Sequence, residues 1–517
     1  MHPGEWAEKT PDKPAVIMHE SGVVVTYREL EDRSRRLAQL WWSIGLRPGD
    51  HVALFMENRA EFYDVAWAAM RSGLYLTTVN RYLTSEEAGY IIDDCDAQSV
   101  VVSATLARAL PDLQTHAPRC HSWLVVGGDV NGYESYEAAT APMPSEPLDE
   151  EPAGAFMLYS SGTTGRPKGI KAPLPGKPLR EHSVGVSGLL ANVFSFDETG
   201  TYLSPAPLYH SAPAGFSVSA QALGGTVVVL EHFDPVGALR AIEQHRVTHS
   251  QWVPTMFVRM LKVPEADRTG FDLSSHRVAI HAAAPCPREV KRQMLEWWGP
   301  VVHEYYAGTE GIGFTYVGPE DWLAHPGTVG KSILGTIHIC NEDGNELPVG
   351  EDGIVYFEQP RIAFEYHNAP EKTRSVKHPQ HDNWAALGDV GHVDADGYLF
   401  LTDRATFMIV AGGVNIYPQE IEDVLVLHPK VTDVAVVGVP NPDLGEEVKA
   451  VVQLADGIDP SDATTEELLA FAREHLARFK VPRSIDYLDE LPRLPTGKLY
   501  KRLLKDRYWG NSDWRIV

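Results

Sequence analysis

Short apolar, β-branched runs alternate with longer segments of helical periodicity through the first three hundred residues. A capping-box pattern joins Thr26 to Glu29, and the residues after it form one apolar helical face at Leu30, Leu37, Trp41 and Ile44. The run HVALFM at 51–56 then has the length of a buried strand. The same alternation predicts helices at 58–72 and 84–95, and strands at 74–79, 99–102, 225–230, 247–253, 277–282 and 301–306. This pattern predicts an α/β fold of mostly parallel, helix-covered sheets.

The pattern changes after about residue 326, where short strands are separated by Gly- and Asp-containing turns. We expect a β-barrel-like, antiparallel subdomain over about 326–403. Past Asp403-Arg404 the pattern predicts a compact α+β unit, with helices at 418–427 and 464–479 and strands at 433–439, 447–453 and 484–488. We therefore predict a large N-terminal domain at 1–403 and a small C-terminal domain at 404–517.

Charge and cysteine usage narrow the function. The 517 residues carry a net charge of −25, which repels nucleic acid and anionic lipid. The four cysteines are far apart in sequence and include no C-x-x-C pair, which favours a reducing compartment over a disulfide framework or a zinc site. The N-terminal sequence lacks a signal-peptide pattern, and no apolar run is long enough to span a membrane. We expect a cytoplasmic protein without integral membrane association.

The segment Tyr159 to Gly169, YSSGTTGRPKG, follows the apolar run AFML and is the most informative in the chain. Its glycines allow close approach of backbone N–H groups, and its hydroxyls and Lys168 add donors and a positive charge, which together suit a polyphosphate. It lacks the P-loop spacing, and composition alone leaves a flexible linker as the alternative. The candidate phosphate-binding residues are Ser160, Ser161, Gly162, Thr163, Thr164, Gly165 and Lys168.

This segment closely resembles the phosphate loop of the adenylate-forming superfamily, which includes acyl-CoA synthetases, luciferases and peptide-synthetase adenylation domains. The resemblance continues in a fixed order over nearly the whole chain, through PLYHS at 207–211, YYAGTEG at 305–311, GDVG at 388–391, DR at 403–404, GGVNIYP at 412–418 and LPTGK at 494–498. It implies a nucleotide-binding N-terminal domain and a mobile C-terminal domain.

The resemblance assigns nucleotide-binding roles to single residues. It implies that Tyr306 lies against adenine, that Thr309 contacts the α-phosphate and that Asp389 binds the ribose, assisted by Arg404. Glu310, with Thr164, would hold Mg²⁺, which prefers hard oxygen ligands. Without the resemblance, Thr309-Glu310 would indicate the start of a helix, and Gly388-Asp389 would indicate an ordinary turn. Ala307 and Leu387 depart from the residues usual in the family.

The resemblance also implies the remaining site residues. Lys498 would stabilise charge as carboxylate and α-phosphate meet, although a lysine near a C-terminus is commonly a solvated surface residue. His210 would gate the carboxylate site, with a structural histidine as its alternative. Thr406 would be the hinge. The expected acyl and CoA pocket residues are Trp252, Ala282, Ala283, Ala284, Gly412 and Gly413. A Pro/Gly-rich segment, IKAPLPGKPLREHSV, replaces the Thr-His pair that often follows the phosphate loop.

The sequence thus predicts an ATP-dependent acid–CoA ligase that uses Mg²⁺ and coenzyme A on a lipophilic acid of fatty, alicyclic or aryl type. The apolar neighbourhood of His210, Phe216 and Trp252 favours that substrate class. Alternatives are an acyl-AMP ligase that loads a carrier protein, a luciferase-like oxygenase and a non-catalytic nucleotide sensor of the same fold. The sequence ends at Val517 with no carrier domain attached, so we expect the acyl-AMP ligase to be the less favoured alternative. The oligomeric state, including a homodimer, stays open.

Overall fold

The computed structural model describes residues 2–159, 167–404, 407–411, 414–493 and 499–509. The chain divides into two compact units, each with its own core. The first comprises Met1–Trp252, Lys262–Ile280 and Ala363–Arg374, and the second Val253–Leu261, His281–Ile362 and Ser375–Val517. The division falls within strand β14 (Val278–His281) and within helix α14 (Pro370–Ser375). Within the described residues, no helix is long and apolar enough to cross a membrane.

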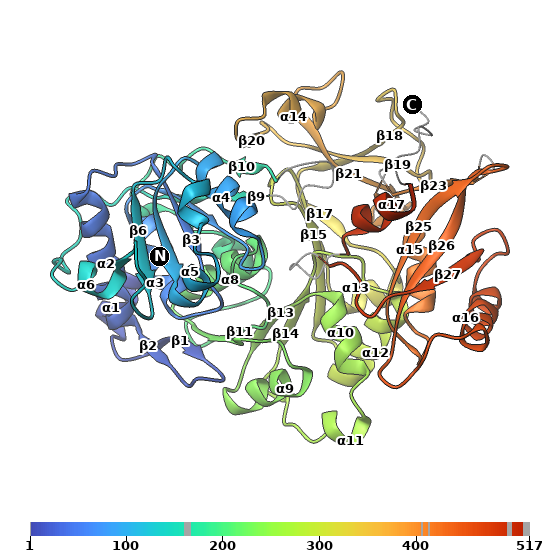
Figure 1. Ribbon diagram of the computed structural model, residues 1–517, viewed down its shortest axis with the longest axis horizontal. Helices are drawn as coiled ribbons and strands as arrows, with labels where there is room; N and C mark the ends of the chain where they lie inside the picture. Colours follow the sequence, from blue (N-terminus) through green and yellow to red (C-terminus); the bar gives the residue numbers. More distant parts are fainter. Residues whose placement is uncertain (1, 160–166, 405–406, 412–413, 494–498, 510–517) are drawn as a thin grey trace. The chain divides into compact units, whose positions relative to one another are not determined.

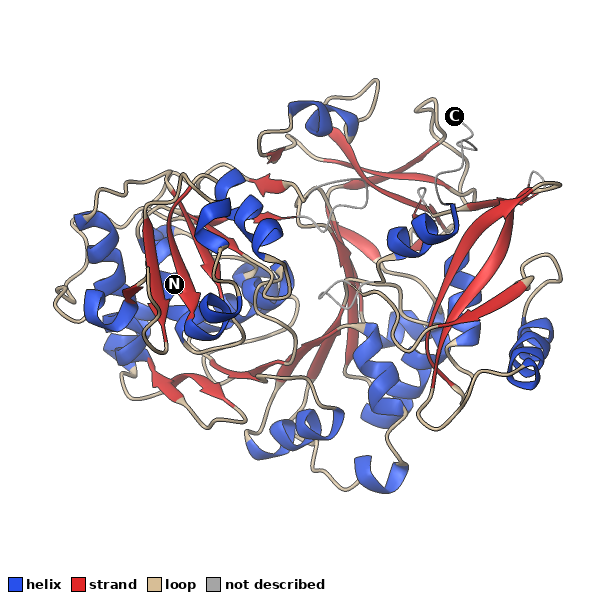
Figure 2. Cartoon of the chain, viewed as in Figure 1, coloured by secondary structure: helices blue, strands red, loops and turns tan. Residues whose placement is uncertain are grey.

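A parallel sheet in the first unit confirms the predicted alternation. Its strands run in the order β7-β6-β5-β3-β4-β8, and all five neighbouring pairs are parallel. The strands are β3 (His51–Phe55), β4 (Tyr75–Thr78), β5 (Ala97–Ser103), β6 (Ser122–Val126), β7 (Glu134–Ser135) and β8 (Ala155–Phe156). Helices flank these strands on both sides (Figure 2). They are α1 (Pro3–Lys9), α2 (Tyr27–Ser43), α3 (Glu61–Arg71), α4 (Ser85–Asp94), α5 (Ala104–Ala109) and α6 (Tyr136–Thr140). The predicted capping box is present, because Thr26 and Glu29 bond each other's backbone N–H at the start of α2.

A second sheet of the same unit contains the strands β13-β11-β12-β1-β2 in that order. Only β1 and β2 pair antiparallel among these. The strands are β1 (Pro14–Met18), β2 (Val24–Thr26), β11 (Thr201–Ser204), β12 (Thr226–Val229) and β13 (His249–Trp252). The unit also contains α7 (Ser187–Asn192), α8 (Ser211–Ala222), α9 (Pro235–Gln244) and α11 (Glu265–Arg268). A small antiparallel sheet joins β9 (Leu158–Tyr159), β10 (Gly169–Lys171) and β20 (Glu365–Tyr366).

Antiparallel pairing dominates the second unit. The strand predicted at 301–306 is β15 (Val302–Ala307), and it pairs antiparallel with β16 (Phe314–Val317), which pairs with β17 (Lys331–Leu334). The expected β-rich subdomain contains β18 (Thr336–Cys340), β19 (Gly353–Glu358), β21 (Trp384–Val393) and β22 (Leu399–Arg404), all antiparallel. Helices α10 (Pro254–Leu261), α12 (Arg288–Trp298) and α13 (Pro319–Ala324) also belong to this unit.

The C-terminal α+β region is built on a sheet of order β24-β23-β26-β25, with β27 parallel to β26. Its strands are β23 (Ile409–Ala411), β24 (Val414–Ile416), β25 (Val431–Asn441), β26 (Gly445–Leu454) and β27 (Ser484–Tyr487). Val434 and Val436 pack with residues of α15 (Pro418–Leu425) and α16 (Asp462–His475). Ala435 and Val437, on the other face, pack with Leu504 of α17 (Lys501–Trp509), which Figure 1 shows beside β25. The predicted helices and strands of this region correspond to α15, α16, β25, β26 and β27, whereas β23, β24 and α17 were not predicted. The predicted domain boundary at 403–404 stays a prediction.

Candidate active site

The predicted phosphate loop begins and ends at two neighbouring strands. Gly169 of β10 pairs with Tyr159 of β9, and Ile170 pairs with Leu158. The Tyr159 hydroxyl donates to Asp94 Oδ2 of α4 at 2.6 Å, which holds the first strand against the parallel sheet. Lys168 lies half-buried directly before β10. The other candidates in this loop, Ser160 to Gly165, lie outside the described residues, so their phosphate-binding roles stay predictions.

A buried polar group behind this hairpin was not predicted from sequence. Lys171 Nζ lies 3.2 Å from His51 Nε2, and its ammonium also lies over the Tyr75 ring, 4.6 Å from the centroid. Burial, and then the charge of Lys171, lowers the pKa of His51 to about 3. His51 is therefore neutral at physiological pH, and its Nε2 accepts a hydrogen bond from the Lys171 ammonium. Because the three residues are far apart in sequence, no local motif indicated the group.

Tyr306 and Asp389, both assigned to the nucleoside, contact each other directly. The Tyr306 hydroxyl on β15 donates to Asp389 Oδ2 on β21 at 2.6 Å. Asp389 is 7% exposed, and the preceding Gly388 has a φ of 85°, a conformation that favours glycine. A carboxylate has about four lone-pair sites and can accept several hydrogen bonds at once, which suits a ribose diol. The structure thus brings together an aromatic ring and a largely buried carboxylate acceptor.

Thr309 and Glu310 lie in a tight turn immediately after β15. The Gly311 N–H donates to the Gly308 carbonyl at 3.1 Å, and Gly311 has a φ of 65°. A Cβ on Gly308 would lie 2.5 Å from Leu387 Cδ2 and 2.7 Å from Glu310 Oε2. A side chain at position 308 would therefore displace the ends of the Leu387 and Glu310 side chains from the turn. Leu387 has a packing role here in addition to departing from the family pattern.

Arg404 and Asp389 are register partners in the antiparallel pair of β21 and β22. The backbone therefore places the two predicted ribose residues opposite each other. Lys498, the hinge residue Thr406 and the glycine pair Gly412-Gly413 lie outside the described residues. Their predicted roles are not tested by the geometry.

His210 is the N-cap residue of α8, and its side chain caps no backbone N–H. Its ring lies 4.2 Å, centroid to centroid, from that of Tyr209. The Thr78 hydroxyl donates to the Tyr209 carbonyl at 2.7 Å, and Asn58 Oδ1 accepts from the Leu208 N–H at 2.8 Å. The segment before α8 is thus fixed to the parallel sheet, which gives His210 a defined place. Its gating role stays a prediction.

The expected acyl-pocket residues fall in both units. Trp252 ends β13, is 1% exposed, and donates its indole N–H to Ser250 Oγ at 2.6 Å. Phe216 of α8 is also buried, and its ring stacks on Tyr202 with a centroid separation of 6.4 Å. Ala282 is buried, Ala283 is exposed with a φ of 76°, and Ala284 is half-buried. An alanine with positive φ is uncommon and marks a constrained turn after β14.

Comparison with known proteins identifies the family. The sequence model of the AMP-binding enzyme family matches residues 4–367, and that of the AMP-binding enzyme C-terminal domain matches residues 420–498. The chain is 33% identical over 512 residues to a feruloyl-CoA synthase from Amycolatopsis, covering 98% of this chain and 99% of that protein. It is 29% identical to a fatty acid–[acyl-carrier-protein] ligase from Streptomyces coeruleorubidus, with 99% and 96% covered.

A solved structure shows the same fold. The crystal structure of an anthranilate CoA ligase in complex with anthranoyl-AMP superposes with a TM-score of 0.84, at 25% identity, covering 98% of this chain and 96% of that one. These similarities confirm the predicted α/β architecture and the predicted resemblance. The chain belongs to the AMP-binding enzyme family, the adenylate-forming enzymes that include the acyl-CoA synthetases.

Proposed function

We propose that this enzyme is an ATP-dependent acid–CoA ligase that works in two steps. In the first, a carboxylate oxygen of the substrate attacks the α-phosphorus of ATP, and pyrophosphate leaves. In the second, the CoA thiol loses its proton and attacks the acyl carbon, and AMP leaves with the bonding electron pair. The observation that carries the proposal is the Tyr306–Asp389 pair beside the Gly308–Gly311 turn, in a chain of this family.

The residues bind and orient the nucleotide, and none of them acts as a nucleophile. Asp389 accepts the ribose hydroxyls as charge-assisted hydrogen bonds, and the Tyr306 ring lies against adenine. Thr309 and the loop that ends at Lys168 donate to the phosphates. Lys498 stabilises the charge that develops when carboxylate and α-phosphate meet.

Mg²⁺ is the divalent cation that suits this site. Glu310 offers a carboxylate close to the turn backbone, and carboxylate oxygens are ligands that Mg²⁺ prefers when it binds phosphates. Glu310, with the Thr164 hydroxyl, would hold the ion. When bound, the ion neutralises phosphate charge. The Glu310 carboxylate lies next to Gly308, and this is the place where the ion would bind.

The thiol acceptor is CoA in our proposal, and a carrier protein is the competing acceptor. Both are represented among the relatives, since one is named a feruloyl-CoA synthase and another a fatty acid–[acyl-carrier-protein] ligase. Gly412-Gly413 resembles the glycine pair past which pantetheine passes in CoA ligases, and this resemblance is our reason for preferring CoA. The carrier-protein alternative predicts thioester formation only when a phosphopantetheinylated carrier is supplied.

The acid is lipophilic, and we place aryl acids first. Feruloyl and anthraniloyl groups in the names of the relatives are aromatic, and Trp252 and Phe216 provide an aromatic, buried environment in the first unit. We also place the enzyme in the cytoplasm, where ATP and CoA are abundant.

A substrate panel tests the function. Ferulic, anthranilic, cyclohexanecarboxylic and long-chain fatty acids are each scored for pyrophosphate release with ATP and Mg²⁺, and then for thioester formation with CoA by mass spectrometry. We expect aryl acids to give both products. Pyrophosphate release without a CoA thioester would favour the carrier-protein ligase, and nucleotide binding without pyrophosphate release would favour a sensor.

A further inference from the structure

Two ion pairs lie at the two ends of the segment that contains Lys498. Arg493 forms an antiparallel bridge with Leu499, and the Tyr500 N–H donates to the Pro492 carbonyl at 2.7 Å. The described residues on either side of 494–498 are therefore held next to each other. This pairing is made by backbone groups and does not depend on charged side chains. The two ion pairs that accompany it therefore need a separate explanation.

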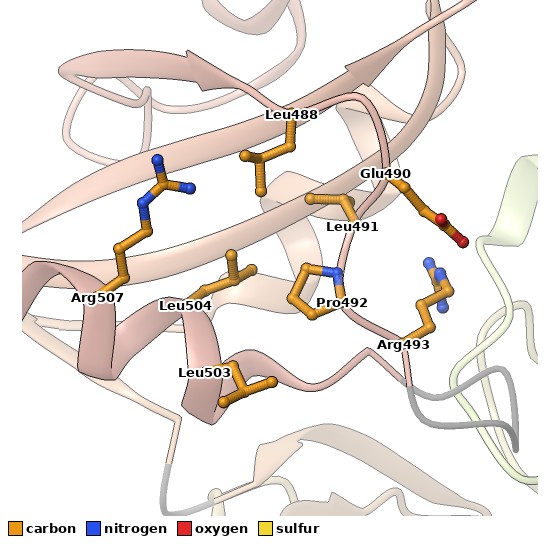
Figure 3. Close-up of a pocket in the computed structure, with 8 residues that line it drawn as sticks. All are labelled: Leu488, Glu490, Leu491, Pro492, Arg493, Leu503, Leu504 and Arg507. Atoms are coloured by element: carbon orange, nitrogen blue, oxygen red, sulfur yellow. The ribbon is translucent and has the colours of Figure 1, made fainter. Parts of the chain in front are cut away.

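The first ion pair fixes the N-terminal side. The Arg493 guanidinium donates through Nε and Nη2 to the two carboxylate oxygens of Asp433 on β25. This two-point geometry defines the orientation of the arginine as well as its position. Leu491, two residues earlier, packs on the same face of β25 as Leu504. Leu491, Arg493 and Leu504 are among the residues that line a pocket of about 470 Å³, which Figure 3 shows between α17 and the segment from Leu488 to Arg493.

The second ion pair fixes the C-terminal side and is buried. Lys501, the first residue of α17, places Nζ 2.8 Å from Glu422 Oε1 of α15, and both side chains are less than a tenth exposed. Glu422 Oε1 also accepts the Val436 N–H at 2.6 Å. In the described sheet β25 is an edge strand, so this carboxylate satisfies a backbone group that has no strand partner. The Lys501 ammonium also lies over the Phe407 ring, 5.5 Å from the centroid.

The N-terminal side of the segment is thus bonded to Asp433 of β25, and the C-terminal side to Glu422 of α15, whose carboxylate in turn accepts the Val436 N–H of β25. A buried ion pair contributes little net stability compared with apolar residues of the same volume, because desolvation offsets the attraction. Specific placement of the chain is a better explanation for burying Lys501 and Glu422. Placement matters here because a catalytic group displaced by about 1 Å can lose about 10²-fold in rate.

We propose that the Arg493–Asp433 and Lys501–Glu422 pairs are positioning residues for adenylation, which fix the described residues on either side of the Lys498 segment to β25 and to α15. The inference rests on the proposed function. It predicts that the pairs matter for the first half-reaction, which uses Lys498, and not for attack of the thiol on a finished acyl-adenylate. They should affect the turnover rate and leave the KM for ATP and acid nearly unchanged, since their proposed role is to place Lys498 and not to bind a substrate.

The test compares Lys501→Met and Glu422→Gln with the conservative variant Lys501→Arg. Adenylation is measured by pyrophosphate–ATP exchange with the best acid of the panel, and thioester formation from synthetic acyl-AMP and CoA. We expect Lys501→Met and Glu422→Gln to lower the exchange rate about 10- to 100-fold with KM values within about threefold. Thioester formation should stay within about threefold of wild type, and Lys501→Arg should recover most of the exchange rate. Arg493→Met gives an independent version of the test should a Lys501 variant fail to fold.

Lys430→Met is the control. Lys430, directly before β25, forms a 2.6 Å ion pair with Glu467 of α16, on a different helix from Lys501. The Lys430→Met variant should lower the melting temperature without separating the two half-reactions. Unchanged exchange in the Lys501 and Arg493 variants, or an equal loss of both half-reactions in step with melting temperature, would overturn the inference. If the wild-type chain shows no exchange with any acid, the proposed function fails first, and this inference fails with it.

Discussion

Removing the Tyr306 hydroxyl tests the nucleoside site at a single atom. Tyr306→Phe keeps the ring and deletes the donor that lies 2.6 Å from Asp389 Oδ2. A hydrogen bond to a charged group is worth about 1.5–3 kcal/mol, so its loss leaves a largely buried carboxylate less well oriented. At about 1.4 kcal/mol per tenfold, we expect the KM for ATP to rise about 10- to 100-fold. The ribose is held in both ground and transition states, so kcat should change less than about threefold.

The assay is steady-state pyrophosphate release against ATP concentration, repeated with 2′,3′-dideoxy-ATP. If Asp389 binds the ribose hydroxyls, wild type and Tyr306→Phe should differ much less with the dideoxy nucleotide. Tyr305→Phe is the control, because Tyr305 is adjacent on β15 and stacks on Phe314 with its centroid 4.7 Å away. An unchanged KM for ATP, or an equal defect with both nucleotides, would refute the reasoning.

The remaining predictions concern the half-reactions, the metal and stability. Lys498→Ala should lose about 10²–10³-fold or more in adenylation yet form thioester from synthetic acyl-AMP near the wild-type rate. Gly413→Leu should show the opposite bias in rapid-quench assays, and equal losses in both half-reactions would contradict the assignment of Lys498 to adenylation and of Gly413 to the thiol step. Activity should be lost in excess EDTA and return with Mg²⁺, because Glu310 offers a hard oxygen ligand; full activity in EDTA would argue against the metal site. Burial raises the pKa of Asp64 in α3 from 3.8 to about 8, so the folded state binds a proton that the unfolded state releases, and stability falls by about 1.4 kcal/mol per unit as pH rises through that window. Asp64→Asn should abolish this slope in urea unfolding measured between about pH 5 and 8, and parallel profiles for variant and wild type would contradict the assignment.

Local sequence patterns predicted the helices and strands. The contacts between site residues depend on long-range packing and could not be predicted from those patterns. The Thr26–Glu29 capping box could be read directly, because both partners lie within one helical turn. The Tyr306–Asp389 contact joins residues 83 positions apart on different sheets, and no periodicity indicates it. The sequence marked Leu387 only as a departure from the residue usual in the family, and the structure shows that its side chain lies close to Gly308.

The C-terminal region shows the same limit. The alternation in 433–439 predicted a strand, and β25 follows it, with Val434 and Val436 on one face. Lys501 and Glu422 were not selected from sequence, because a lysine and a glutamate on amphipathic helices normally face solvent. Their burial depends on how α15 and α17 pack on β25, which composition does not specify.

The central claim, attack of a carboxylate on the α-phosphorus of ATP, is tested most directly by isotope transfer. The enzyme is given ATP, Mg²⁺, CoA and an acid labelled with ¹⁸O in both carboxyl oxygens, and the products are analysed by mass spectrometry. The acyl carbon keeps one heavy oxygen in the thioester, and the other must leave with the phosphate that activated it. The account predicts AMP with one ¹⁸O and unlabelled pyrophosphate. Label in orthophosphate together with ADP, or AMP without label, would contradict it.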